Sequence, residues 1–153
     1  MLLEIIFKGV FSVLNLSFLS QFIINGKDLR FNYPENYHSK NFEEIVKKIE
    51  DNEYVDFVIT TDEFYIDERI IPKVFINITK DKDNVEILLY FDLQDFNKKD
   101  TKKGIDELIN WTNSFKINYN FNYYVCQIDN ADEMEYYFDS NGIGPLYDSI
   151  SRC

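Results

Sequence analysis

Several short segments of the chain alternate apolar and polar residues, the pattern of β-strands that bury one face. Residues 55–60 and 74–79 show this alternation clearly, and residues 123–128 form another strand-like run. Residues 85–91 are nearly all apolar, which predicts a strand near the centre of a sheet. The polar segment 81–84 lies between two of these runs and is therefore predicted to be a hairpin loop.

The amino-terminal part of the chain contains a strong turn signal at Asn25-Gly26. Asn followed by Gly tolerates the positive φ angles that a tight hairpin turn requires. Apolar and polar residues alternate over 29–33, directly after this dipeptide. We therefore predict a β-hairpin over about residues 16–33.

Two further segments repeat apolar residues at the spacing of an amphipathic helix. The first stripe consists of Phe42, Ile45, Val46 and Ile49, preceded by the candidate caps Ser39 and Asn41. The second consists of Ile105, Leu108, Ile109, Thr112 and Phe115, preceded by the candidate caps Asp100 and Thr101. Strands before, between and after two helices predict a single α+β domain over residues 1–153. Its sheet is expected to be antiparallel-rich, with both helices packed on one face.

Length, composition and charge narrow the classes of function. The chain has 153 residues, of which 45% are apolar, enough for one core, and no repeat or linker divides it. The formal net charge is -11 and the isoelectric point is about 4.5. Contacts with phosphate groups need lysine and arginine, so this charge disfavours nucleic acids and anionic membrane surfaces as partners.

Residues 1–22 are apolar enough to raise the question of export or membrane insertion. No basic segment precedes the apolar run, no small-residue cleavage site follows it, and polar residues interrupt it. We expect a buried strand or helix here instead. The two cysteines are too few for a disulfide scaffold, which favours a protein of the reducing cytoplasm.

No motif in the chain predicts catalysis, a cofactor or a metal site. His38 is the only histidine, so a catalytic triad or a histidine-rich metal site lacks partners, and we expect a surface or capping role. Cys126 lies in a predicted strand without a nearby histidine or second cysteine, as an unreactive thiol would. Residues 81–84 lack the glycine and glutamate of a calcium loop, and residues 141–145 match no phosphate-binding loop, so a tight turn is expected there.

The carboxyl-terminal stretch has an unusual composition, because residues 117–151 contain no lysine or arginine but many carboxylates and tyrosines. Tyrosine offers a large rigid contact area with a hydroxyl group, and unneutralised carboxylates attract a basic partner. We predict that this stretch binds a basic protein partner, with Asp132 and Tyr147 toward the rim of the contact surface. The predicted contact residues are Asp132, Glu133, Glu135, Tyr136, Tyr137, Asp139 and Tyr147.

The size, acidity and aromatic content of the chain resemble those of small acidic immunity proteins, which bacteria encode beside polymorphic or contact-dependent toxins. The segment Tyr136 to Tyr147 is the most distinctive part of the sequence. The resemblance implies a non-catalytic cytoplasmic protein that neutralises a cognate basic toxin domain, such as a nuclease. An acidic and aromatic surface would then occlude the active site of the toxin.

Two other classes of function stay open at this point. Acidic pairs such as Asp62 with Glu63 and Asp67 with Glu68 could serve a small enzyme, if the fold set two carboxylates at a catalytic separation. A structural or regulatory subunit could instead pair through the apolar amino-terminal segment. The acidity could also serve solubility alone.

Overall fold

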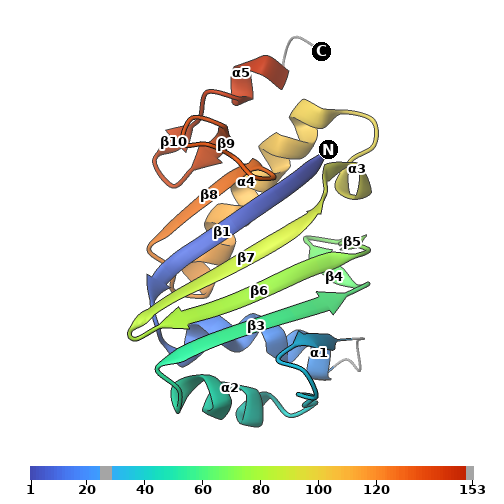
Figure 1. The fold of residues 1–153 in the computed structure, drawn as a ribbon. Helices are drawn as coiled ribbons and strands as arrows, with labels where there is room; N and C mark the ends of the chain where they lie inside the picture. Colours follow the sequence, from blue (N-terminus) through green and yellow to red (C-terminus); the bar gives the residue numbers. More distant parts are fainter. Residues whose placement is uncertain (25–28, 151–153) are drawn as a thin grey trace.

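A computed structural model describes residues 1–24 and 29–150 of the chain, and within them eight strands form one antiparallel sheet (Figure 1). The strand order is β10-β9-β8-β1-β7-β6-β3-β2. These strands are β1 (Leu2–Val10), β2 (Arg30–Tyr33), β3 (Tyr54–Thr61), β6 (Val74–Asp81), β7 (Asn84–Asp92), β8 (Tyr123–Ile128), β9 (Tyr136–Asp139) and β10 (Gly142–Ile143). A separate hairpin consists of β4 (Phe64–Ile66) and β5 (Arg69–Ile71).

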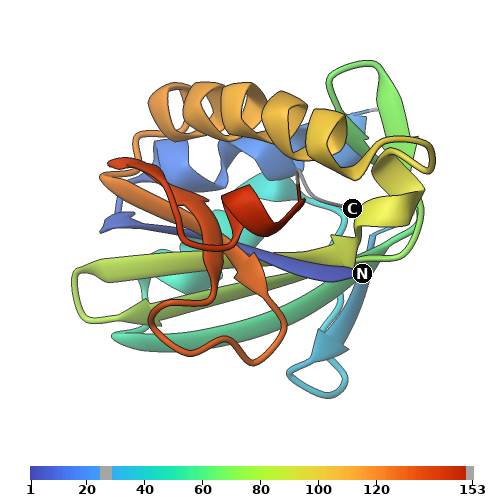
Figure 2. The same cartoon turned by 90° about the horizontal axis from the view of Figure 1, so that it is seen from above.

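The helical segments gather on one side of this sheet. They are the 3-10 helix η1 (Val13–Leu19), α1 (Ser20–Ile24), α2 (Phe42–Glu50), α3 (Leu93–Phe96), α4 (Thr101–Asn118) and α5 (Tyr147–Ile150). Figure 2 shows α4 and η1 above the strands, whereas Figure 1 looks onto the opposite side, where no described helix crosses the central strands. The α+β fold and the antiparallel sheet predicted from the sequence are therefore confirmed.

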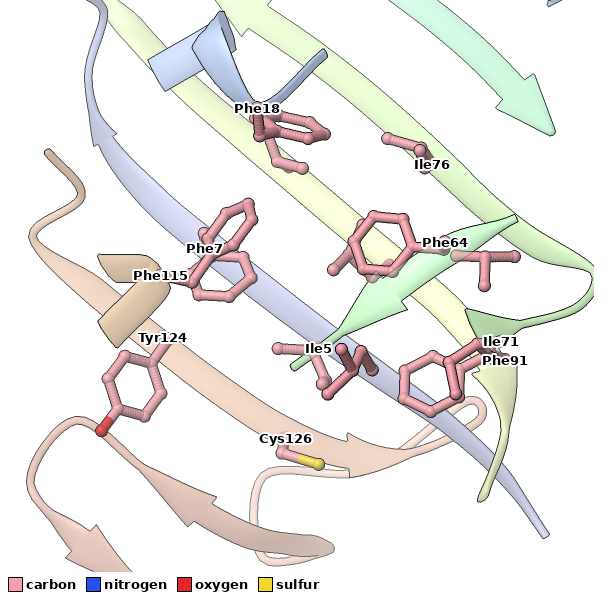
Figure 3. Close-up of a cluster of buried hydrophobic side chains, with 14 of the residues drawn as sticks. Ile5, Phe7, Phe18, Phe64, Ile71, Ile76, Phe91, Phe115, Tyr124 and Cys126 are labelled. Carbon is pink, nitrogen blue, oxygen red and sulfur yellow. The ribbon is translucent and has the colours of Figure 1, made fainter. Parts of the chain in front are cut away.

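The core lies between the sheet and the helices, because alternate side chains of each strand point into it. Val74, Ile76 and Ile78 of β6 are buried, while the residues between them are not. Phe7 of β1 packs against Phe115 of α4, with ring centroids 4.5 Å apart (Figure 3). The aromatic rings thus join the centre of the sheet to its main helix.

Both predicted amphipathic helices are present, and each begins at an identified cap. The Asn41 side chain accepts hydrogen bonds from the backbone N–H groups of Glu43 and Glu44, at 2.9 and 3.3 Å. The Asp100 side chain accepts one from the Lys103 N–H at 3.1 Å. These bonds satisfy amide donors that the first turn of a helix leaves without partners.

The predicted strands 55–60, 74–79, 85–91 and 123–128 are confirmed, with residues 81–84 forming the hairpin between β6 and β7. Lys82 takes the positive φ angle of this turn, at 55°. The apolar segment at residues 1–22 forms β1 followed by η1 and the start of α1, and each of these elements contributes buried side chains to the core, as predicted. No helix among the described residues is long and apolar enough to cross a membrane.

The predicted hairpin over residues 16–33 is wrong. Residues up to Ile24 are helical, β2 pairs with β3 instead, and the expected turn at residues 25–28 lies outside the described residues. The reason is tertiary packing. The helical conformation of η1 buries Phe18 against Phe115, with ring centroids 5.3 Å apart. Burial against α4 outweighs the β-propensity of the local sequence.

Candidate partner-binding surface

The structure distributes the predicted contact residues over three places rather than one cluster. The β8–β9 connection carries Asp132, Glu133 and Glu135, strand β9 carries Tyr136, Tyr137 and Asp139, and helix α5 begins with Tyr147. Each group has its own surroundings. Only some of the seven side chains are therefore placed to meet one partner together.

The β8–β9 connection forms a compact acidic loop. The Glu135 N–H donates to the Asp132 carbonyl at 3.0 Å, and the Asp132 N–H donates back to the Glu135 carboxylate at 3.2 Å. Asp132 and Glu133 are exposed, and Glu135 is half-buried. In Figure 2 this loop extends on the side of the sheet away from α4. Its carboxylates thus border the side that no described helix crosses.

Tyr136 is fixed in place by Gly144 of the following turn. A Cβ atom at position 144 would lie much closer to the Tyr136 ring and to the Tyr136 carbonyl oxygen than van der Waals contact allows. The Leu146 N–H also donates to the Tyr136 carbonyl at 3.1 Å. Glycine at 144 is required by this close approach. The predicted tight turn is confirmed only in part, because the chain reverses at residues 140–141 and residues 142–143 form β10, which pairs with β9.

Tyr137 is a core residue, contrary to its predicted place in the contact surface. Its side chain is 5% exposed, and its hydroxyl donates to the sulfur of Met1 at 3.0 Å. Burial, followed by the nearby Cys126, raises the pKa of the Tyr137 hydroxyl above its ordinary value. Adjacent residues of a strand point to opposite faces, so Tyr136 and Tyr137 cannot both face a partner.

Tyr147 lies with the helices, away from the acidic loop. Its hydroxyl donates to the Asp106 carboxylate of α4 at 2.6 Å, and the Lys102 ammonium lies 5.8 Å from the centre of its ring. The hydrogen bond to Asp106 raises the pKa of Tyr147 above its ordinary value. Tyr147 thus belongs to the helix side, and its predicted role at the rim stays a prediction.

The side of the sheet opposite the helices, which we call the open sheet face, carries apolar and polar residues that are mostly half-exposed, while Ile6 and Val125 on it are buried. It is formed by the residues that alternate with the core positions, namely 4, 6 and 8 on β1, 56, 58 and 60 on β3, 75, 77 and 79 on β6, 86, 88 and 90 on β7, and 123, 125 and 127 on β8. The Tyr90 hydroxyl donates to the Asp129 carboxylate at 3.5 Å, which links this face to the acidic loop.

Charge is distributed unevenly between the two sides of the molecule. Helix α2 has three carboxylates and two lysines, and α4 has two carboxylates and three lysines, so the two helices balance. Residues 129–139 hold five carboxylates and no lysine or arginine. Near β9, the pKa of the Tyr123 hydroxyl is raised above its ordinary value, mainly by burial and further by the neighbouring Asp139 and Tyr136. The negative field is therefore concentrated at the β8–β9 end of the sheet.

The other candidate residues show no arrangement for chemistry. Cys126 is fully buried, and burial raises the pKa of its thiol, so the reactive thiolate is disfavoured. His38 is exposed, with its ring edge-on to Phe31 at 6.4 Å between centroids. Among residues 1–24 and 29–150, no three histidine, cysteine or carboxylate side chains are grouped to hold a metal ion.

The open sheet face has no clear signal in the sequence. Leu88 and Tyr90 belong to the apolar run that predicts a strand near the centre of the sheet, yet both side chains are half-exposed. Phe75 is 43% exposed although its neighbours in sequence are core residues. The sequence signal that could have revealed this face is the occurrence of large apolar residues at the outward positions of several neighbouring strands.

Comparison with known proteins gives a consistent result. The model of a family described as PABL017 Cdi1I immunity protein matches residues 1–142. A similar solved chain belongs to the 1.75 Å crystal structure of the toxic C-terminal tip of CdiA from Pseudomonas aeruginosa in complex with immune protein. Its TM-score is 0.72 at 27% sequence identity, over 95% of this chain and 97% of that chain. Among curated proteins, none matches.

Proposed function

The chain belongs to the PABL017 Cdi1I immunity protein family, and from this premise we propose that it binds and neutralises a cognate toxin domain. The similar solved structure supports the proposal, because it pairs a CdiA toxin tip with an immune protein. The cognate toxin of this chain would then be the C-terminal tip of a CdiA-like protein. The family match over 142 of the 153 residues is the observation that carries this proposal.

The charge of the chain indicates what kind of surface the toxin domain presents. A net charge of -11, concentrated in part at residues 129–139, attracts a basic partner over several ångströms. Opposite potentials accelerate association by 10 to 1,000-fold, which favours capture of a toxin before it acts. We propose that the cognate domain is basic, and that Asp132, Glu133, Glu135, Tyr136 and Asp139 contribute to its contact surface.

Neutralisation is proposed to work by occlusion rather than by chemistry. Cys126 is buried, and His38 is exposed with its ring edge-on to Phe31, so neither favours a catalytic role. A rigid, acidic surface laid over a basic active site excludes the substrate and needs no bond to be broken. The place of action is proposed to be the cytoplasm of the cell that makes the chain.

A pull-down from the native bacterium tests the proposal. The tagged chain is expected to retain a protein that carries a toxic, basic C-terminal domain, at one copy per chain. Co-expression of the chain with that domain should restore growth. Mass spectrometry should then find the recovered domain unchanged in mass, because an occluding inhibitor leaves its target intact.

Two results would contradict the proposal. Absence of any stoichiometric partner, together with no rescue of growth, would remove the immunity function. A covalent change in the recovered toxin domain would instead show that the chain acts as an enzyme on it.

A further inference from the structure

We propose that the open sheet face is the docking surface for the toxin domain, with exposed Phe75 and half-exposed Tyr90 as its main aromatic contacts. This inference rests on the proposed function and adds where the partner binds. It differs from the prediction made from the sequence, which places the contact in the carboxyl-terminal stretch alone. The acidic loop becomes one border of the surface rather than its centre.

The first argument is the apolar content of a face that no described helix crosses, where Leu88 is half-exposed although its row neighbours Ile6 and Val125 are buried. Val125, Ile6 and Leu88 are direct cross-strand neighbours on β8, β1 and β7. Beside this row, Phe75 and Tyr90 pair edge to face, with ring centroids 5.9 Å apart. Partly exposed aromatic side chains beside apolar and polar residues are typical of protein interfaces.

The second argument is the ring of carboxylates around Tyr90. Partial desolvation, followed by the charges of Asp129, Glu4 and Asp92, raises the pKa of the Tyr90 hydroxyl. Two of these carboxylates are held in position: Glu4 accepts a hydrogen bond from the Gln127 amide at 2.9 Å, and Asp92 pairs with the chain amino terminus at 2.9 Å. Glu4 and Asp129 therefore place negative charge beside the half-exposed ring of Tyr90 before any partner arrives, while the amino terminus balances the charge of Asp92.

The third argument is the shape at the hairpin end of the same face. A hollow of about 330 Å³ lies there, lined in part by Lys8, Thr79, Glu86 and Tyr123. These four residues form one cross-strand row over β8, β1, β7 and β6. A projecting side chain of a partner can enter this hollow while the flatter part of the face covers Phe75 and Tyr90.

These features fit one occupant, a basic protein domain that presents arginine or lysine beside apolar residues. A guanidinium group can lie over the ring of Tyr90 while the surrounding carboxylates neutralise its charge. The helix side is less suited, because α2 and α4 together are electrically balanced. The carboxylates around Tyr90 therefore favour the open sheet face over the surfaces of α2 and α4 for a basic toxin domain.

Dissociation kinetics against the toxin domain recovered by the pull-down test this inference. We compare the variants Phe75→Ala and Tyr90→Ala with Ile70→Ala, which truncates a 50% exposed residue of the β4–β5 hairpin on the helix side. Each open-face truncation should raise the dissociation rate by roughly tenfold or more, whereas the control should stay within about twofold. Phe75→Lys, which adds a positive charge to the face, should weaken binding further.

The controls separate the possible failures. Cooperative unfolding of every variant in urea shows that lost binding is not lost folding. If wild-type chain fails to bind any toxin domain, the proposed function fails. If wild-type chain binds and both open-face truncations dissociate as slowly as it does, the function stands and the docking site is wrong. A concentration-dependent dimer of the free chain that Phe75→Lys abolishes would show that a second copy occupies this face, which also overturns the inference.

Discussion

Lys80 of β6 donates a hydrogen bond of 2.8 Å to the backbone carbonyl of Asn52, just beyond the end of α2. Its buried ammonium group also donates to the carbonyls of Ile49 and Glu50, at 3.0 and 3.3 Å. The last carbonyls of a helix have no partners within the helix. One buried lysine of the sheet thus fixes the carboxyl-terminal end of α2 against the core.

Replacement of this lysine is expected to destabilise the fold. Lys80→Met keeps the aliphatic stem but leaves several carbonyl groups without a donor in a buried place. Hydrogen bonds to a charged group contribute about 1.5–3 kcal/mol, so we expect a loss of this order in the free energy of unfolding. Urea denaturation measures it. Lys98→Met, which changes an exposed lysine, is the control, and equal stability of the two variants would contradict this account of Lys80.

The contact between Gly144 and Tyr136 predicts a second stability effect. Gly144→Ala forces the Tyr136 ring and the backbone of β9 to move apart. Overpacking of this kind costs about 1–3 kcal/mol in the free energy of unfolding. Thermal or urea unfolding checks the loss. Asn141→Ala changes an exposed residue of the same turn and should cost less, so a Gly144→Ala variant as stable as that control would show that the turn is loose.

Stability is expected to fall in alkaline solution. Burial raises the pKa of the Cys126 thiol and of the Tyr124 and Tyr137 hydroxyls in the folded chain. The folded state therefore holds these protons more tightly than the unfolded state does, and stability decreases as pH rises above the unfolded values. Those values are about 8.5 for cysteine and about 10 for tyrosine.

Urea midpoints measured from about pH 7 to about pH 11 test this sign, with the tyrosine contribution appearing above about pH 10. The Cys126→Ala variant should lose less stability between about pH 8.5 and 10 than the wild type does. A stability that stays constant or rises over this range would contradict the buried placement of these groups.

Exposed carboxylates of the β8–β9 loop should control the rate of association with the toxin domain. Glu133→Lys is expected to slow association by roughly two- to tenfold at low ionic strength, because steering depends on the local field. The difference should shrink near 0.15 M salt, where the Debye length is about 8 Å. Glu68→Lys makes the same change of charge in the β4–β5 turn and should have a smaller effect. Equal slowing by both variants would mean that only net charge matters.

The elements that the sequence predicted correctly are those with a long and regular pattern. The apolar stripes of α2 and α4 extend over two or more helical turns, and the apolar–polar alternation of β3 and β6 extends over two or more residue pairs. Each pattern arises because one side of the element is buried. Residues 16–24 are apolar without a clear period, so local propensity could not reveal that α4 would bury them as helical turns.

The candidate surface was only partly visible in the sequence for a related reason. Composition located the acidic loop, because the absence of lysine and arginine needs no knowledge of the fold. Composition could not separate Tyr136 from buried Tyr137, since that difference depends on the register of β9. It also could not show that Phe75 and Tyr90 meet, because they are 15 positions apart in the sequence and only the β6–β7 pairing brings them together.

Site-specific photo-crosslinking tests the central claim most directly, because it reports contact without requiring a loss of affinity. A benzophenone-bearing phenylalanine analogue replaces Phe75 on the open sheet face, or Ile70 on the helix side, in chains that still protect cells from the toxin. Illumination of the complex is expected to join the toxin domain covalently to the chain through position 75 and not through position 70. An adduct formed from position 70 but not from position 75 would show that the toxin binds the helix side, and would contradict the account.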